Sequence, residues 1–405
     1  MDLNPVILSI PLYFLLIGLE LIFQTVKKVK LYRTNDAITN ISCGISSQVT
    51  NALWGVLSIG MYEFVSHNFT LISIPDTWWS WLVLFVLVDL MYYWFHRASH
   101  EINFLWNTAH VVHHQSEDYN LSVALRQSSF GGVFSMVFYL PLAVMGFSSY
   151  AFLTVKGLNL IYQFWIHTEA IRKLPRWFEY LFNTPSHHRV HHGRNPKYID
   201  RNHAGTLMIW DRLFGTFQAE EETPTYGVTK PINTWNPVWA NVLPILDMIK
   251  QFAATPGISN KLKVLFYKPG WQPMEQGGYQ PAPELSTVDT TKFDLYPNLS
   301  MIRYAIGQFA LTLGFTTLFL FTSSGYSYWM KWLFAGFIIW SILALGLLME
   351  DRKWMRYTEV VRIFAGGALI FWAVTLSFNA YMAGGFILLS LAWLLIANKR
   401  SHLTI

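Results

Sequence analysis

Long apolar stretches constrain the fold of this chain more than any other feature of its sequence. Nine of them are long enough, or nearly so, to cross the roughly 30 Å hydrocarbon core of a bilayer as a helix. Hydrophobic residues make up 53% of the 405 residues and charged residues 13%, a composition typical of integral membrane proteins. We therefore predict an all-α, polytopic helical membrane protein. The predicted spans are residues 6–23, 44–65, 79–95, 131–147, 150–166, 304–322, 328–348, 360–376 and 380–397.

The distribution of basic residues predicts the orientation of these spans. Lysine or arginine follows the first, third, fifth, seventh and ninth stretches, whereas the short loops 66–77 and 323–327 contain neither. By the positive-inside rule, the amino terminus lies outside and the basic clusters lie on the cytoplasmic side. The first stretch lacks a basic n-region and a small-residue cleavage site, so we interpret it as a retained span. The short fourth and fifth stretches could instead form a half-inserted hairpin.

Histidine is concentrated on the predicted cytoplasmic side. Eleven of the thirteen histidines lie there or at the membrane boundary, and only His67 and His402 lie apart. Cys43 is the only cysteine, which excludes an intrachain disulfide, a thiolate metal site and an iron–sulfur cluster. Any metal must therefore be bound by nitrogen and oxygen. The net charge of +5 is explained by the orientation of the spans and gives no reason to expect a nucleic-acid partner.

Three histidine clusters have the spacing of metal ligands on helices. The sequence HRASH puts its two histidines one turn apart on the same helix face. HVVHH and HRVHH each have histidines at i, i+3 and i+4, and we expect the three imidazoles of each to converge on one side. Eight such nitrogens can bind two first-row transition ions and leave coordination positions open. The clustered residues are His96, His100, His110, His113, His114, His188, His191 and His192.

Two simpler interpretations explain these clusters less well. An isolated histidine such as His67 is interpreted as structural. Repeated clusters are hard to explain by packing, because burying an imidazole without a hydrogen-bond partner costs free energy. None of the three clusters contains the glutamate of the HExxH zinc-protease motif. The clusters therefore predict a metal site of another kind.

Four segments around the clusters carry a resemblance to a known family. HRASHE, HVVHHQSEDYN, NTPSHHRVHHGRN and GTLMIWDRLFGTF resemble the fatty acid hydroxylase and sterol desaturase superfamily of membrane di-iron enzymes. The resemblance covers about residues 79–271. YQFWIHTE and YKPGW make the alkylglycerol monooxygenase branch the most similar one.

The resemblance implies a set of iron ligands. The eight clustered histidines match the eight-histidine pattern of the superfamily, which binds two iron ions. His167 and His187 occupy positions where related sterol enzymes also have histidine, so they are implied as additional ligands. His203 departs from the pattern, because relatives usually have an aromatic residue after the asparagine that corresponds to Asn202. We therefore do not predict His203 as a ligand.

Polar residues close to the clusters are candidates for supporting roles in catalysis. Asp89 lies two helical turns before His96 and could accept an imidazole N–H, or it could make a hydrogen bond that only packs helices. Asn120 lies close to the second cluster and is open to both interpretations. In the alkylglycerol branch an acidic residue of the SEDYN segment is associated with the pterin site or the iron surroundings. This association favours Glu117 as a catalytic and cofactor-binding residue.

The two electrons for oxygen reduction must come from outside the chain. The sequence contains no haem-binding cytochrome domain, no GxGxxG motif between a strand and a helix, and no cysteines for a cluster. Resemblance to the alkylglycerol branch implies a reduced pterin, tetrahydrobiopterin. Resemblance to the wider superfamily also permits an external reductase, such as a ferredoxin or cytochrome partner.

The predicted organisation has three parts. Residues 1–250 form a membrane-embedded catalytic domain, and residues 301–405 form a four-span helical bundle that is structural or contributes to a substrate channel. Residues 251–300, rich in proline and glycine, form an irregular cytoplasmic segment that packs over the site or links the other two parts.

The resemblance implies an enzyme that uses two iron ions and O2 to hydroxylate a membrane lipid at the cytoplasmic face of a bacterial inner membrane or the endoplasmic reticulum. Hydroxylation beside the ether oxygen of an alkylglycerol would give a hemiacetal, which breaks down to an aldehyde and a glycerol product. One alternative is a sterol, fatty-acyl or amino-lipid hydroxylase or desaturase. Another is a metal transporter, which would require histidines facing one another across the membrane.

Overall fold

The computed structural model describes residues 5–283, 291–295, 299–352, 354–373 and 379–401. In these ranges the regular secondary structure is helical, and the only β-type pairing is an isolated bridge between Phe182 and Leu207. The all-α prediction is therefore confirmed. The chain forms two compact units, one from residues 1–232 and 241–292 and the other from residues 233–240 and 293–405.

The first unit contains the helices that precede α14. Most are short, and η1 and η2 are single π-helical and 3-10 turns. α12 begins in the second unit and continues in the first. The helices are α1 (Pro5–Leu8), α2 (Ile10–Lys27), α3 (Thr34–Phe69), α4 (Trp78–Glu101), α5 (Asn103–Leu105), η1 (Trp106–His110), α6 (Val111–His114), η2 (Val123–Leu125), α7 (Gly131–Val144), α8 (Ser149–Phe164), α9 (Arg176–Leu181), α10 (Pro185–His192), α11 (Ile209–Leu213), α12 (Pro237–Ala254), α13 (Ile258–Phe266) and η3 (Met274–Gln276).

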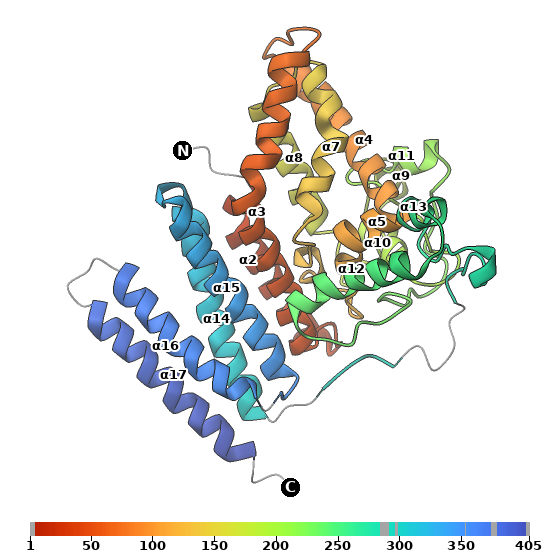
Figure 1. Ribbon diagram of the computed structural model, residues 1–405. Helices are drawn as coiled ribbons and strands as arrows, with labels where there is room; N and C mark the ends of the chain where they lie inside the picture. Colours follow the sequence, from red (N-terminus) through yellow and green to blue (C-terminus); the bar gives the residue numbers. More distant parts are fainter. Residues whose placement is uncertain (1–4, 284–290, 296–298, 353, 374–378, 402–405) are drawn as a thin grey trace. The chain divides into compact units, whose positions relative to one another are not determined.

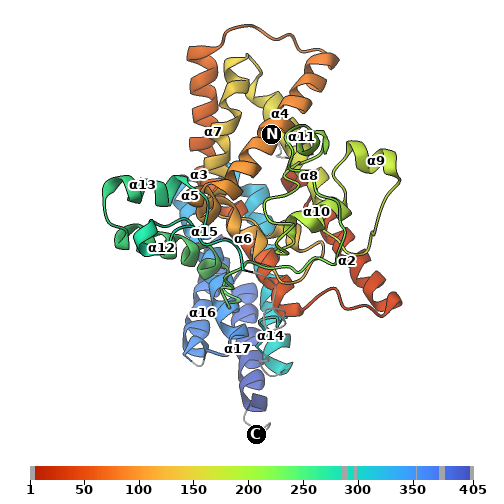
Figure 2. The ribbon, with the colours of Figure 1, turned by 90° about the vertical axis from the view of Figure 1, so that its right-hand side faces the viewer.

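Four helices build an apolar core in the first unit. α7 packs against both α3 and α4, and α8 packs against α4, as Figures 1 and 2 show. Tyr62 of α3 stacks on Phe152 of α8 with ring centroids 4.6 Å apart, and the buried Leu84 and Val88 of α4 belong to the same cluster. This packing fixes α4, whose last two turns carry His96 and His100.

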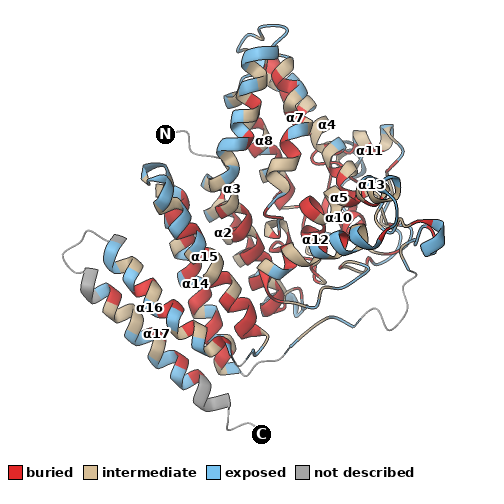
Figure 3. Ribbon diagram, viewed as in Figure 1, coloured by how far each residue is buried: buried red, intermediate tan, exposed pale blue. Residues whose placement is uncertain are grey.

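The two halves of α3 differ in polarity. Figure 3 shows the buried residues of this helix gathered towards its N-terminal half, and many of them are polar. Asn40 is fully buried, and its side-chain amide donates to Asp36 at 2.8 Å and to Ser122 at 3.0 Å. These hydrogen bonds attach α3 to the segment that follows the second histidine cluster.

Four of the described helices are long and apolar enough to cross a membrane: Ile10–Lys27, Trp78–Glu101, Leu299–Gly325 and Tyr328–Met349. All nine predicted stretches overlap helices, but the other five do not meet both conditions. α7 and α8 have only 14 and 16 residues, which span about 21 and 24 Å at the helical rise. The second stretch lies in α3, whose polar half lowers its hydropathy. Residues 374–376 of the eighth stretch lie outside the described residues.

The second unit is built from α14 (Leu299–Thr322), η5 (Ser323–Gly325), α15 (Tyr328–Met349), α16 (Met355–Ala373) and α17 (Asn379–Ser401). α14 packs against α15 and α17, and α16 packs against the same two helices.

An ion pair is buried inside this second unit. Glu359 and Arg362 lie one turn apart on α16, and their closest N–O distance is 2.6 Å. Tyr304 donates to the same carboxylate at 2.5 Å, and Arg362 donates to the side-chain oxygen of Gln308 at 2.7 Å. Charged residues in apolar helices are retained where they find such partners, so this network joins α14 to α16.

Candidate metal centre

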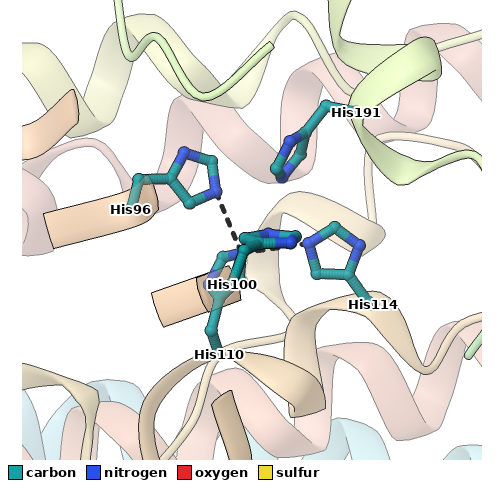
Figure 4. A group of neighbouring side chains, drawn as sticks. All are labelled: His96, His100, His110, His114 and His191. Carbon is teal, nitrogen blue, oxygen red and sulfur yellow. Dashed lines mark hydrogen bonds between the residues drawn. The ribbon is translucent and has the colours of Figure 1, made fainter. Parts of the chain in front are cut away.

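Nine buried histidines form two adjacent groups. Within each group, one ring nitrogen from every member lies within 4.8 Å of those of the others. Figure 4 shows the rings of the larger group pointing towards one another. The five-histidine group consists of His96, His100, His110, His114 and His191, and the four-histidine group consists of His113, His167, His188 and His192.

The nitrogens within each group are close enough to share one ion. In the five-histidine group, the Nε2 atom of His110 lies 2.9 Å from that of His96 and 3.0 Å from that of His114. In the other group, Nε2 of His167 lies 3.1 and 2.9 Å from the nearest two imidazole nitrogens. An ion about 2.0–2.1 Å from each ligand, at octahedral or tetrahedral angles, separates neighbouring ligands by about 2.9–3.4 Å. The observed separations fit this range.

Spacing along the chain decides which group each histidine joins. Partners at i and i+4 stay together, as His110 and His114 do in the five-histidine group, whereas His113 belongs to the other group. The third cluster is divided in the same way, with His191 separated from its two neighbours at i, i+4 spacing. The three imidazoles of each cluster lie close together, as expected, with ring centroids no more than 5.6 Å apart, but they are divided between the two groups. Each cluster therefore supplies ligands to both groups.

Local backbone structure positions these histidines. His110 ends the π-helical turn η1, and π-turns inside helices are frequent at functional sites. α10 begins with Pro185, which suits the first turn of a helix, and all eight of its residues are buried. His167 lies just beyond the end of α8.

Backbone carbonyls orient four of the nine rings. In each case Nδ1–H donates to a carbonyl oxygen, which fixes the tautomer and directs Nε2 into the group. Metal-binding histidines have this kind of second hydrogen bond almost universally. The bonds join His96 to His203, His113 to Arg126, His167 to Gln163 and His191 to Arg201, at 2.7, 2.9, 2.8 and 2.9 Å.

Burial keeps the imidazoles in the form that binds metal. Desolvation lowers the pKa of His113 to about 4, and it lowers the pKa values of His114 and His192 well below their usual range. Burial would raise the pKa of Asp200, but the nearby His100 and Lys268 outweigh it and lower the pKa to about 2. The Asp200 carboxylate lies 3.7 Å from Nδ1 of His100. It can therefore help to orient this ring.

The donor set fits first-row transition ions. Among the described residues both groups contain imidazole only, and imidazole suits iron, copper, nickel and zinc. Nε2 of His100, His191 and His192 is buried without a hydrogen-bond partner in the described part of the chain. A buried polar atom left without a partner costs about 1–3 kcal/mol, and a bound ion removes this cost. The two groups therefore have the chemistry of a two-ion centre.

Comparison with known proteins identifies the family. Residues 81–216 match the model of the fatty acid hydroxylase family, "Fatty acid hydroxylase". The alkylglycerol monooxygenase of Homo sapiens is 40% identical over 356 residues, which cover 87% of this chain and 79% of that protein. The chain belongs to the alkylglycerol monooxygenase family. The Xenopus tropicalis member is 47% identical over 262 residues, covering 64% of this chain and 58% of that protein. The Caenorhabditis elegans member is 31% identical over 87% of this chain and 73% of its own length.

No solved structure matches this chain in the comparison. Membership of the alkylglycerol monooxygenase family identifies an oxygen-using lipid monooxygenase, and together with the histidine groups it indicates that iron is the metal.

One predicted ligand lies outside both groups. His187 is buried, but its ring lies 5.6 Å from that of Phe217, and its Nδ1 atom is 3.3 Å from the hydroxyl of Thr184. The residue precedes His188 on α10, so its side chain points away from the i, i+4 pair that enters the four-histidine group. The structure therefore brings nine of the ten predicted ligands together.

Asp89 supports the site through the backbone of a loop. Its two oxygens accept hydrogen bonds from the backbone N–H groups of Thr206 and Leu207 at 2.7 and 2.9 Å, from Trp210 Nε1 at 2.9 Å and from Asn159 Nδ2 at 2.6 Å. Both oxygens are used in attaching the 205–210 loop to α4. Of its two predicted roles, the packing hydrogen bond describes these contacts.

Glu117 and Asn120 contact the segment that joins α2 to α3. Glu117 pairs with Arg33 at 3.4 Å. Asn120 donates to the carbonyl of Leu31 at 2.8 Å and accepts from the hydroxyl of Ser122 at 2.6 Å. Neither residue is a member of a histidine group.

A cavity of about 200 Å³ leads to both histidine groups. Residues 268–270 and 279–283, which follow α13, form part of its wall. Gly227 also lines the cavity, and a Cβ atom there would lie 3.2 Å from Cγ of Glu117. The histidines that line the cavity are His100, His114, His191 and His192.

Sequence reasoning missed the role of Arg126. This buried residue donates to the carbonyl of Val112 at 2.8 Å and to the side chains of Asn40 and Gln115, and its own carbonyl orients His113. The sequence offered one signal for this role, because Arg126 is a charged residue in a segment of otherwise uncharged residues. Its partners are visible only in the tertiary structure.

Proposed function

We propose that this protein is a di-iron monooxygenase that cleaves the O-alkyl ether bond of alkylglycerols. One atom of O2 is inserted into the C–H bond beside the ether oxygen, and the other is reduced to water with two electrons and two protons. The resulting hemiacetal breaks its C–O bond, and its hydroxyl proton moves to the leaving oxygen, which gives a fatty aldehyde and the glycerol product. The relatives named above support this reaction for the chain.

The observation that carries the proposal is the direct contact between two all-imidazole groups. His114 of the five-histidine group and His192 of the four-histidine group stack with ring centroids 4.4 Å apart. Two iron ions bound in these groups supply the redox chemistry that reduces oxygen and oxidises an unactivated C–H bond.

The residues of the chain contribute orientation, neutral donors and exclusion of water. Carbonyl hydrogen bonds fix the rings, and burial keeps them uncharged, so protons do not compete with metal near neutral pH. Low solvent access around the groups protects the reaction from water, and the cavity is a route for a small polar molecule. A histidine-lined transporter is less well supported, because the histidines form one compact double group and not a path along the spans.

The reductant in this proposal is tetrahydrobiopterin, with an external electron-transfer protein as the alternative. The cavity offers polar and aromatic groups beside the histidines, including Trp106, Asp200 and Tyr279. Glu117, next to Gly227 at the cavity wall, is the proposed pterin-binding carboxylate. Asn120 is proposed to hold the Glu117 segment, and Asp89 to support His96 through α4. Four apolar helices support an integral membrane protein, whose catalytic face we propose to be cytoplasmic in a bacterial inner membrane or the endoplasmic reticulum.

The test is turnover by the purified, iron-loaded protein. Detergent-solubilised protein is incubated with oxygen, tetrahydrobiopterin and a panel of alkylglycerol, sterol and fatty-acyl lipids, and fatty aldehyde is measured. We expect aldehyde from alkylglycerol only, and a loss of roughly 100-fold or more in H96A, since losing even an indirect metal contact costs 10–100-fold. Hydroxylated sterol or acyl chain without aldehyde would contradict the proposal.

A further inference from the structure

His203 lies against the five-histidine group although its position argued against a ligand. Its side chain is fully buried, and its ring centroid is 5.1 Å from that of His100 and 5.7 Å from those of His96 and His191. Members of the group are separated by similar distances, up to 6.0 Å for His110 and His191. By ring position, His203 is as close to three members as some members are to each other.

Both ring nitrogens of His203 are buried and make no hydrogen bond of normal geometry in the described part of the chain, where the nearest backbone group that influences the ring belongs to Asp200. Buried polar atoms without a partner are rare, and each one indicates strain or an absent water or ion. The other histidines with such an atom are His100, His188, His191 and His192, all members of the two groups. The feature found in four of the nine group members is therefore also found in His203, and it is not found in His187.

The backbone of His203 is fixed beside the group. Its N–H donates to Asp211 at 2.8 Å, and its carbonyl accepts from Nδ1–H of His96 at 2.7 Å. Asp211 is fully buried and also accepts from the N–H of Ala204 at 2.7 Å. These hydrogen bonds hold the main chain of His203 next to His96, so its ring stays beside the five-histidine group.

We propose that His203 is a sixth imidazole ligand of the ion in the five-histidine group. The inference rests on the proposed function only in requiring a two-ion centre. It makes the two positions unequal, because six imidazoles complete an octahedral sphere, whereas the four-histidine group leaves positions open. Small molecules would then bind at the four-histidine group, unless His203 is displaced.

The first experiment uses iron-57-loaded protein and Mössbauer spectroscopy, which reports each iron without requiring turnover. We expect H203F to change the quadrupole doublet of one iron only and to lower the chelator concentration that removes one ion by at least about tenfold. Added imidazole should restore the original doublet in H203A, because free imidazole can occupy the space of the missing ring. H187F is the matched control, since His187 is equally buried but lies outside both groups, and it should retain both original doublets.

Two unchanged doublets in H203F, with both ions retained, would overturn the proposal. If the variants do not fold, a structure of the unaltered iron-loaded protein decides. A His203 nitrogen within about 2.5 Å of the ion would support the proposal, and one held beyond hydrogen-bond distance would overturn it. Two bound irons together with unaffected His203 variants would refute this inference and leave the proposed function intact, whereas failure to form aldehyde would leave the ligand assignment intact.

Discussion

His113 and His114 are neighbours in the chain, yet their imidazoles belong to different groups. Their ring centroids are 5.6 Å apart and their planes meet at 87°. His191 and His192 repeat this relationship at 5.3 Å and 87°. Each group therefore takes ligands from α6 and from α10, and the two short helices hold both positions at a fixed separation.

This division predicts that neighbouring substitutions affect different ions. H113A should release the ion of the four-histidine group, and H114A should release that of the five-histidine group. Each variant should retain about one ion per chain and lose roughly 100-fold or more in aldehyde formation, because both positions are needed. Metal analysis and Mössbauer spectra of the two variants provide the check. The same residual iron signal in both would disprove the division.

Asp89 predicts a stability effect without a change of ligand. D89L removes four hydrogen bonds and leaves the N–H groups of Thr206 and Leu207 buried without an acceptor. Each unsatisfied donor costs about 1–3 kcal/mol, so we expect a loss of about 3 kcal/mol or more in the free energy of unfolding. Thermal unfolding in detergent measures this loss, with D76N at an exposed aspartate as control. Equal unfolding temperatures for both variants would refute the role assigned to Asp89.

Much of the site was predictable from local sequence, because histidines at i and i+4 on a helix must share a face. His96 with His100 and His188 with His192 follow this rule. The position of the i+3 histidines relative to a second ion was not predictable, because it depends on how α6 and α10 face each other. His203 was considered and not predicted as a ligand, because it departs from the family pattern. The role of Arg126 was missed because its contacts depend on how the chain folds after α6 and on α3, which carries Asn40.

The fold was predictable at the level of helices and less so at the level of spans. Apolar runs locate helices, but whether a run crosses a membrane depends on helix length and on polar neighbours. The buried polar half of α3 illustrates the effect of polar neighbours, and α7, with only 14 residues, illustrates the effect of helix length.

Acidification should destabilise the metal-free protein. The folded pKa of His113 is about 4, below its ordinary value of about 6.5, so between these values the unfolded chain binds a proton that the folded chain does not. Stability is therefore greatest above pH 6.5 and falls towards pH 4, by about 1.4 kcal/mol per pH unit for each such imidazole. Denaturant unfolding at pH 7 and 5.5 measures the slope, and H113F should reduce it. A flat profile would contradict neutral burial of the histidines.

Removing one partner of the buried ion pair in the second unit should destabilise the protein more than removing both partners. Removing one partner with R362L leaves Glu359 buried and uncompensated, and should destabilise this unit by about 3–5 kcal/mol. The double variant E359L/R362L should recover much of this loss. Limited proteolysis and thermal unfolding measure the stability of the second unit. The metal content of both variants should equal that of the unaltered protein. A double variant less stable than R362L would contradict the expected desolvation penalty.

The most direct test of the two-ion centre is anomalous diffraction at the iron absorption edge from crystals of the iron-loaded protein. The account predicts two peaks, one surrounded by His96, His100, His110, His114 and His191 and the other by His113, His167, His188 and His192. A single peak, or two peaks that lie elsewhere in the protein, would contradict it.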